Sequence, residues 1–130
     1  MPDPTILTPH NRKILEIMIA DCRAGARGLR LGSDSPSRTP DERDADRAKA
    51  DAMDRTADDA ARTIAQSNDA ERAVLQSHVD LCNRRVLDAH RYGTITQQNE
   101  AEGCRRDAMD ALVAFNLRTI RMVPVTHVRA

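Results

Sequence analysis

The sequence predicts an all-α protein, an antiparallel helical bundle of three long helices with a shorter N-terminal helix and short extended termini. Only Tyr92 and Phe115 are aromatic among the 130 residues, so other side chains supply most of the apolar 40%. Ala, Leu and Met, which are strong helix formers, are prominent among them. Apolar residues also recur at alternating spacings of three and four, and helix-capping sequences separate these periodic runs.

Hydroxyl side chains that precede proline mark two helix starts. Thr8 stands before Pro9, and Thr39 stands before Pro40. In each pair the hydroxyl can cap the helix, and proline at the first helical position gives up no intrahelical hydrogen bond. Glu42 follows Thr39 by three residues and completes a capping box.

Three further signals set the remaining boundaries. Asn68 and Glu71 repeat the capping pattern, Gly93 supplies a C-terminal stop, and Thr96 can cap the helix that follows. The four predicted helices are therefore 9–24, 40–66, 69–92 and 97–122. Residues 66–69 contain neither Gly nor Pro, so one uninterrupted helix over 40–92 is left open as the alternative.

The apolar stripes differ in strength between the predicted helices. The third helix has larger side chains at Leu75, Val79, Cys82, Val86 and Ala89, and the fourth has Ala101, Cys104, Ala108, Leu112 and Phe115, flanked by Val113, Leu117 and Ile120. The second helix begins with only Ala45, Ala48 and Ala52 and continues through Met53, Ala57, Ala60 and Ile64. Since alanine buries little area, we expect the firmest core between the third and fourth helices and the weakest packing over 40–56.

The chain is long enough for one helical domain, which we predict over 1–130. Within it, Gly25, Gly28 and Gly32 together with several arginines predict a flexible basic linker over 25–38. The apolar residues of 123–130 predict an extended C-terminal arm.

The charge and the cysteine content of the chain limit which partners and which cellular compartment are expected. The 20 basic residues balance the 20 acidic ones, so no net charge draws the chain towards nucleic acid or an anionic membrane. The first apolar run is too short and too polar to span a bilayer, so no membrane association is expected. The cysteines Cys22, Cys82 and Cys104 are odd in number, which favours reduced thiols and a cytoplasmic location, or a virion or host cytoplasm for a phage-encoded chain.

The sequence predicts a non-enzymatic protein without metal or cofactor. It contains no glycine-rich nucleotide loop, no phosphate-binding loop and no nucleophile elbow. The best metal-ligand candidates are His78 and Cys82, one turn apart on a single helical face, with Cys104 on the next predicted helix. His90 is a possible fourth ligand but lies two to three turns from His78. Because both of these cysteines lie on apolar stripes, we interpret them as small core residues.

We therefore predict a protein-interaction module, a small helical adaptor or inhibitor that occupies a surface of another protein. One candidate surface is acidic and comprises Asp51, Asp54, Asp58 and Asp59. An acidic helix of this kind could imitate the charge of a nucleic-acid backbone towards a nucleic-acid-binding protein. The other candidate is an arginine cluster at Arg84, Arg85, Arg105 and Arg106, which could grip an acidic surface.

Two alternatives stay open. The chain could be a structural subunit of a larger assembly such as a phage particle, in which case a homo-oligomer is expected. It could also bind nucleic acid through the arginines of the linker and of the predicted hairpin, although zero net charge argues against direct nucleic-acid contact. The arginine cluster also has a simpler interpretation as an ordinary solvent-exposed helix face. Asp88 lies four residues from Arg84, and Glu102 and Asp110 each lie four residues from Arg106, so neighbouring acids can neutralise these arginines.

Overall fold

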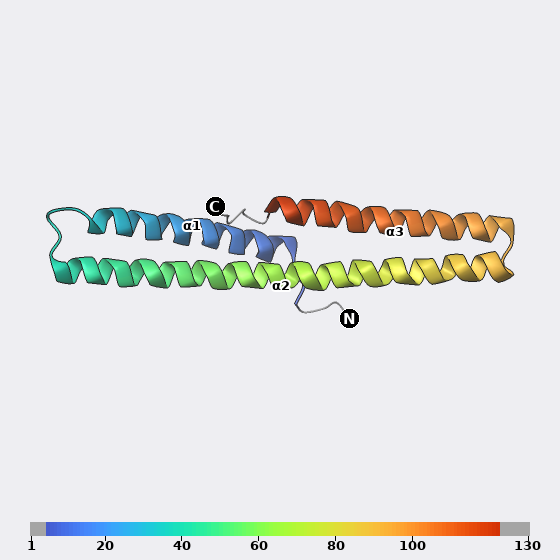
Figure 1. Ribbon diagram of the computed structural model, residues 1–130, viewed down its shortest axis with the longest axis horizontal. Coiled ribbons are helices and arrows are strands. Elements are labelled where there is room, and N and C mark those ends of the chain that lie inside the picture. Colours follow the sequence, from blue (N-terminus) through green and yellow to red (C-terminus); the bar gives the residue numbers. More distant parts are fainter. Residues whose placement is uncertain (1–4, 123–130) are drawn as a thin grey trace, which may run out of the picture. The chain divides into compact units, whose positions relative to one another are not determined.

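The structure, a computed structural model, describes residues 5–122, with side chains up to residue 120, and confirms the all-α class. Three helices follow one another along the chain: α1 (Pro9–Ser33), α2 (Pro40–Tyr92) and α3 (Ile95–Met122) (Figure 1). The described part of the chain contains no strand. The expected C-terminal arm, 123–130, lies outside the described residues.

The caps of α1 and α2 are those that the sequence predicts. The Thr8 hydroxyl accepts a hydrogen bond from the backbone N–H of Asn11 at 3.1 Å. The backbone N–H of Thr39 donates to the Glu42 carboxylate at 3.0 Å, and the Glu42 N–H donates to the Thr39 hydroxyl at 3.2 Å. This reciprocal pair is a capping box, which satisfies two backbone donors at the start of α2.

The predicted start of the fourth helix was wrong by two residues. Thr94, and not Thr96, caps α3: its N–H donates to Gln97 Oε1 at 2.9 Å, and its hydroxyl accepts from the Gln97 N–H at 3.2 Å. Thr94 has a glutamine three residues later, which makes it the better cap. α2 ends at Tyr92, as the predicted stop at Gly93 requires.

The predicted break at 66–69 was also wrong, and the single-helix alternative is correct. The predicted helices 40–66 and 69–92 are one helix, and Asn68 lies inside it instead of at its start. The neighbouring Ser67 is buried, and its hydroxyl accepts hydrogen bonds from the Leu7 N–H at 2.9 Å and from Arg12 Nη2 at 3.1 Å. The Ser67 hydroxyl is occupied by Leu7 and Arg12, and Asn68 is buried within the helix. Neither side chain therefore caps the start of a separate helix.

The predicted flexible linker is largely helical. Residues 25–33 extend α1 by about two and a half turns beyond the predicted end at residue 24. The connection to α2 is only 34–39, and Arg38 anchors it by donating to Asp46 at 2.9 Å and to Glu42 at 2.9 Å. The glycines lower helix propensity but do not prevent the helix.

The chain divides into two compact units at residues 67 and 68. Unit 1, as described from residue 5, comprises α1 and the part of α2 up to Ser67. Unit 2, as described to residue 122, comprises the rest of α2 and α3. Each unit is an antiparallel pair of helices (Figure 1).

Unit 1 is packed mainly through alanine. Its buried apolar residues are Ala26 on α1 and Ala50, Ala57 and Ala60 on α2. The predicted stripe through Ala45, Ala48 and Ala52 was misplaced, because all three are exposed. The side chains that face α1 lie at alternating spacings of three and four along the row Asp46, Ala50, Met53, Ala57, Ala60 and Ile64.

In each unit we call the line of contact between the two helices the seam. The seam of unit 2 contains larger side chains than that of unit 1. Val79, Cys82 and Ala108 form a buried cluster, against which Leu112 packs, and Val86 and Phe115 are also buried. Arg72 links the two helices by donating to Asn116 Oδ1 at 2.8 Å. Cys104, expected in the seam, is exposed instead.

Candidate interaction surfaces

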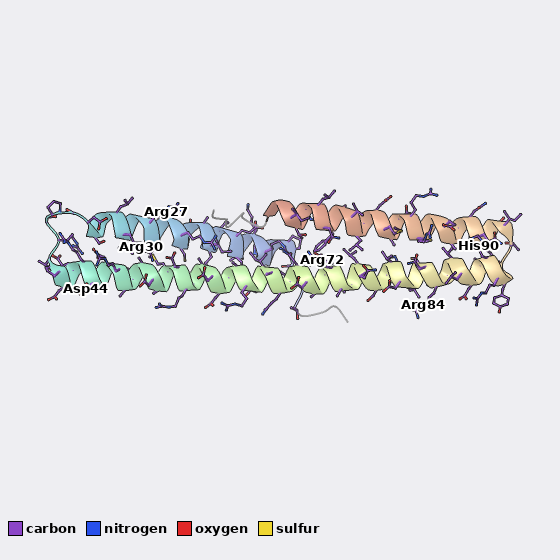
Figure 2. All side chains as sticks on the ribbon, in the orientation of Figure 1. Arg27, Arg30, Asp44, Arg72, Arg84 and His90 are labelled. Carbon is purple, nitrogen blue, oxygen red and sulfur yellow. The ribbon has the colours of Figure 1, made fainter. Side chains whose placement is uncertain are left out.

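The four predicted acidic residues are paired with arginines of unit 1. Arg30 on α1 reaches the carboxylates of Asp51 at 2.8 Å and Asp54 at 2.6 Å. Arg23, also on α1, lies 3.8 Å from Asp58. Asp59 pairs with Arg62 one turn along α2, at 2.9 Å. The structure thus brings Asp51, Asp54 and Asp58 beside α1. Arg30 projects between the two helices (Figure 2).

The charges of the two helices in unit 1 are complementary. α1 carries five basic and two acidic residues, a net charge of +3, whereas residues 40–67 carry five basic and eight acidic ones, a net charge of −3. The hydrogen bonds to Asp51 and then to Asp54 raise the pKa of Arg30 above its ordinary value. The negative charge of residues 40–67, which was predicted to bind an external partner, is therefore largely balanced by the positive charge of α1.

The four arginines of the predicted cluster do not converge. Among the described residues, Arg105 forms an ion pair with Glu102 at 2.9 Å, and Arg84, Arg85 and Arg106 form none. Arg84 follows the buried Cys82 by two residues, which turns it about 200° away from the seam, and it points away from α3 (Figure 2). Among the described residues, neither Arg84 nor Arg106 forms an ion pair with the acids four residues away, and Arg84 is directed away from the other predicted members of the cluster on α3.

The histidine–cysteine candidates do not form a metal centre within the described residues. His78 Nε2 lies 3.9 Å from Cys82 Sγ, while His90 Nε2 lies 3.3 Å from a Glu102 carboxylate oxygen instead. Cys104 is exposed. Residues 5–120 contain no group of three or more His, Cys, Asp or Glu side chains placed to hold a metal ion.

Sequence reasoning missed an exposed apolar face on α3. Met109, Val113, Leu117 and Ile120 are 47%, 55%, 55% and 70% exposed. Their spacing of four, four and three places them along one side of the helix. The spacing is visible in the sequence, but Val113, Leu117 and Ile120 were interpreted as flanks of the buried stripe that contains Ala108 and Phe115. We call these four residues the α3 stripe.

The turn of unit 2 has a second group of exposed apolar side chains. Leu87, Tyr92 and Ile95 are 58%, 86% and 75% exposed. The turn at Gly93 is tight, so that a Cβ at this position would lie only 2.8 Å from the carbonyl oxygen of Ala89. Compared with the α3 stripe, these three side chains have no regular spacing along one helix face.

Comparisons with protein-family models, curated proteins and solved structures give no match for this chain. None of the helices over residues 9–122 combines the length and the apolar character needed to cross a membrane. The functional interpretation consequently depends on the geometry of the surfaces.

Proposed function

We propose that this chain is a protein-interaction module, an adaptor or inhibitor, that binds another protein chain by packing a helix against the α3 stripe. The observation that carries the proposal is the exposure of Met109, Val113, Leu117 and Ile120, each about half or more exposed, in one row. Contiguous exposed apolar surface of this kind is typical of sites where proteins bind one another.

The energetics favour such a use of the stripe. Full burial of an aliphatic side chain contributes about 1.5–3 kcal/mol relative to exposure. The four stripe residues already have part of their surface covered, so a partner helix gains on the order of half of that at each position. Aliphatic anchors at these spacings are also the pattern by which one helix packs on another.

The acidic residues of α2 are the weaker candidate surface. Asp51 and Asp54 both accept hydrogen bonds or ion pairs from Arg30, and Asp58 lies near Arg23. A basic partner would have to compete with these arginines for the same carboxylates. Exposed ion pairs contribute little each, so the exchange of one set for another gives a small net gain.

The proposal is tested by affinity capture from host cells with three forms of the protein. The stripe variant carries Val113→Asp and Leu117→Asp, and its matched control carries Ala114→Asp, an exposed position on the same helix but off the stripe. We expect the wild-type and control proteins to retain the same partners and the stripe variant to lose them, with unchanged helical circular dichroism.

A fourth form separates the two surfaces. It replaces Asp51, Asp54, Asp58 and Asp59 by Asn and leaves the α3 stripe intact. If this form loses the partners while the stripe variant keeps them, the acidic surface is the binding site and the proposal for the stripe is wrong.

A further inference from the structure

We propose that the α3 stripe binds the α3 stripe of a second copy of this chain, antiparallel, with the two-fold axis at Val113. The inference rests on the proposed function, because it takes the stripe as the docking surface, and it adds the identity of the partner. The evidence is the order of residues along the stripe, their exposure, and the exposed Arg106 that precedes them.

The stripe has matching side chains on either side of Val113. Met109 lies four residues before it and Leu117 four residues after it, and both are about half exposed. An antiparallel pair centred on Val113 therefore places Met109 of each copy against Leu117 of the other, and Val113 against its own copy. This is an isologous contact, in which each surface patch meets itself.

The outer positions fit the same register. Arg106 lies seven residues before Val113, and Ile120 lies seven residues after it, so the two face each other across the antiparallel pair. Arg106 is exposed and has no ion pair within the described residues, and Ile120 is 70% exposed. The methylene stem of an arginine can cover an aliphatic side chain while its guanidinium remains in water.

Other pairings of the two helices are poorer. A parallel pair places Arg106 against Arg106 and Glu102 against Glu102, which brings like charges together. An antiparallel pair centred two residues earlier, at Ala111, places Leu117 against Arg105 and Ile120 against Glu102. Among the antiparallel registers, only the centre at Val113 places an exposed apolar side chain opposite each of Met109, Val113 and Leu117.

The contact is small, so we expect a weak dimer. Residues 106–120 of α3 span about 21 Å at 1.5 Å per residue. Stable interfaces bury about 800 Å² on each partner, and a single helix pair of this length buries roughly half of that. An interface of this size lies below the standard class, so we expect a weak and transient dimer.

Sedimentation velocity over a concentration series measures this association directly. The wild-type chain is expected to change from monomer to dimer as its concentration passes through the micromolar range. Val113→Asp places two carboxylates at the axis and is expected to weaken the dimer at least tenfold, whereas Ala114→Asp, with the same charge off the stripe, is expected to leave it unchanged. Equal dimerisation of the two variants would overturn the inference.

Cysteine cross-linking tests the register. In a background with Cys22→Ala and Cys104→Ser, Val113→Cys places the two thiols together at the axis, and oxidised glutathione accepts the two electrons and two protons released when the disulfide forms. We expect the covalent dimer at least ten times faster than with Asp107→Cys, an exposed α3 position on another face. Equal rates for the two would rule out the proposed axis.

The two sets of experiments separate the inference from the proposed function. A wild-type chain that stays monomeric at several hundred micromolar, but loses captured partners on Val113→Asp and Leu117→Asp, refutes self-association and leaves the stripe as a site for a different protein. If the chain is monomeric and both substitutions leave the captured partners unchanged, the proposed function of the α3 stripe and its self-association are both refuted.

Discussion

The two units of this protein have the same antiparallel geometry, but they fill it with different side chains. Unit 1 buries Ala26 and Ala57 together with other alanines, whereas unit 2 buries Val79, Val86 and Phe115. Larger apolar side chains remove more surface from water, so unit 2 has the greater hydrophobic stabilisation. The comparison shows that a regular spacing of three and four defines the seam in both units but does not fix how strongly it holds.

The polar contacts beside the two seams also differ, because those of unit 1 depend more on charge. Unit 1 aligns its helices with ion pairs such as Arg30 to Asp54, which remain partly exposed. In unit 2, Arg72 pairs with Asp69 on its own helix at 3.0 Å, but across to α3 it donates to the neutral side chains of Asn116 and Thr119. Its guanidinium lies 5.6 Å from the centre of the Phe115 ring. Added salt should therefore weaken unit 1 more than unit 2, because it screens exposed charges.

The largest expected effect is that of Phe115→Ala in unit 2. Phe115 is 2% exposed, and its removal leaves a cavity and costs roughly 3–5 kcal/mol of unfolding free energy. Urea denaturation measures the loss, with Leu87→Ala, at an exposed position of the same unit, as the control. In the wild-type chain, backbone amide hydrogens should exchange most slowly at 79–86 and 108–115. If unit 2 is the more stable unit, the amides of unit 1 should exchange faster than those of unit 2.

The next largest effect is expected for Ala57→Leu in unit 1. Ala57 is fully buried between closely packed helices, so a larger side chain forces them apart and costs about 1–3 kcal/mol. Thermal denaturation compares this variant with Ala48→Leu, which adds the same atoms at an exposed position. Equal melting temperatures for the two would show that the alanine seam tolerates expansion and is not closely packed.

A smaller effect, in the opposite direction, is expected from the glycines of α1. A Cβ at Gly28 or Gly32 meets no atom within 4 Å, so replacement by Ala adds helix propensity without a clash. Each substitution is expected to stabilise unit 1 by roughly 0.5–1 kcal/mol. Gly93→Ala is the contrasting variant: it should destabilise, because its Cβ would crowd the Ala89 carbonyl oxygen at 2.8 Å.

The smallest effect concerns pH and the start of α2. Hydrogen bonds from the Thr39 backbone and hydroxyl, followed by the charge of Arg38, lower the pKa of Glu42 below its ordinary value. A carboxylate with a lowered pKa contributes stability that is present above its unfolded pKa and is lost as the pH falls through its folded pKa.

Glu42→Gln removes this titration and keeps a side chain that can complete the capping box. The pH dependence of unit 1 unfolding below about pH 4.5, the ordinary range for glutamate, should become shallower in this variant. Glu100→Gln, on an exposed glutamate of α3, is the control. An unchanged acid limb for Glu42→Gln would show that the cap does not contribute through its charge.

Local sequence signals predicted much of the fold because they act over a few residues. Thr8 and Thr39 cap their helices, and Gly93 ends α2, through contacts within one turn of the chain. The seam of unit 2 followed from the period of Val79, Cys82 and Ala108, whose apolar side chains distinguish the buried face from the exposed ones. Alanine gives no such contrast, which is why the start of the unit 1 stripe was misplaced. Its continuation through Met53, Ala57, Ala60 and Ile64 was correct.

The candidate surfaces were less accessible to sequence reasoning. The acidic residues around Asp54 were predicted to seek an external partner, because their cations on α1 lie more than twenty residues away in the chain. The exposed side of α3 was missed for a related reason. Val113 and Leu117 are as apolar as the residues of the seam, and only the position of α2 shows which side of α3 is covered.

The sequence by itself determined the helical class, the helix starts at Pro9 and Pro40 and the strong seam of unit 2, because backbone capping and hydrophobic periodicity are short-range properties. The tertiary structure decided that residues 25–33 are helical and which carboxylates their arginines meet. A glycine-containing helix end is marginal by propensity alone, and contacts between segments distant in sequence, such as Arg30 with Asp51, supply the stabilisation that local signals lack.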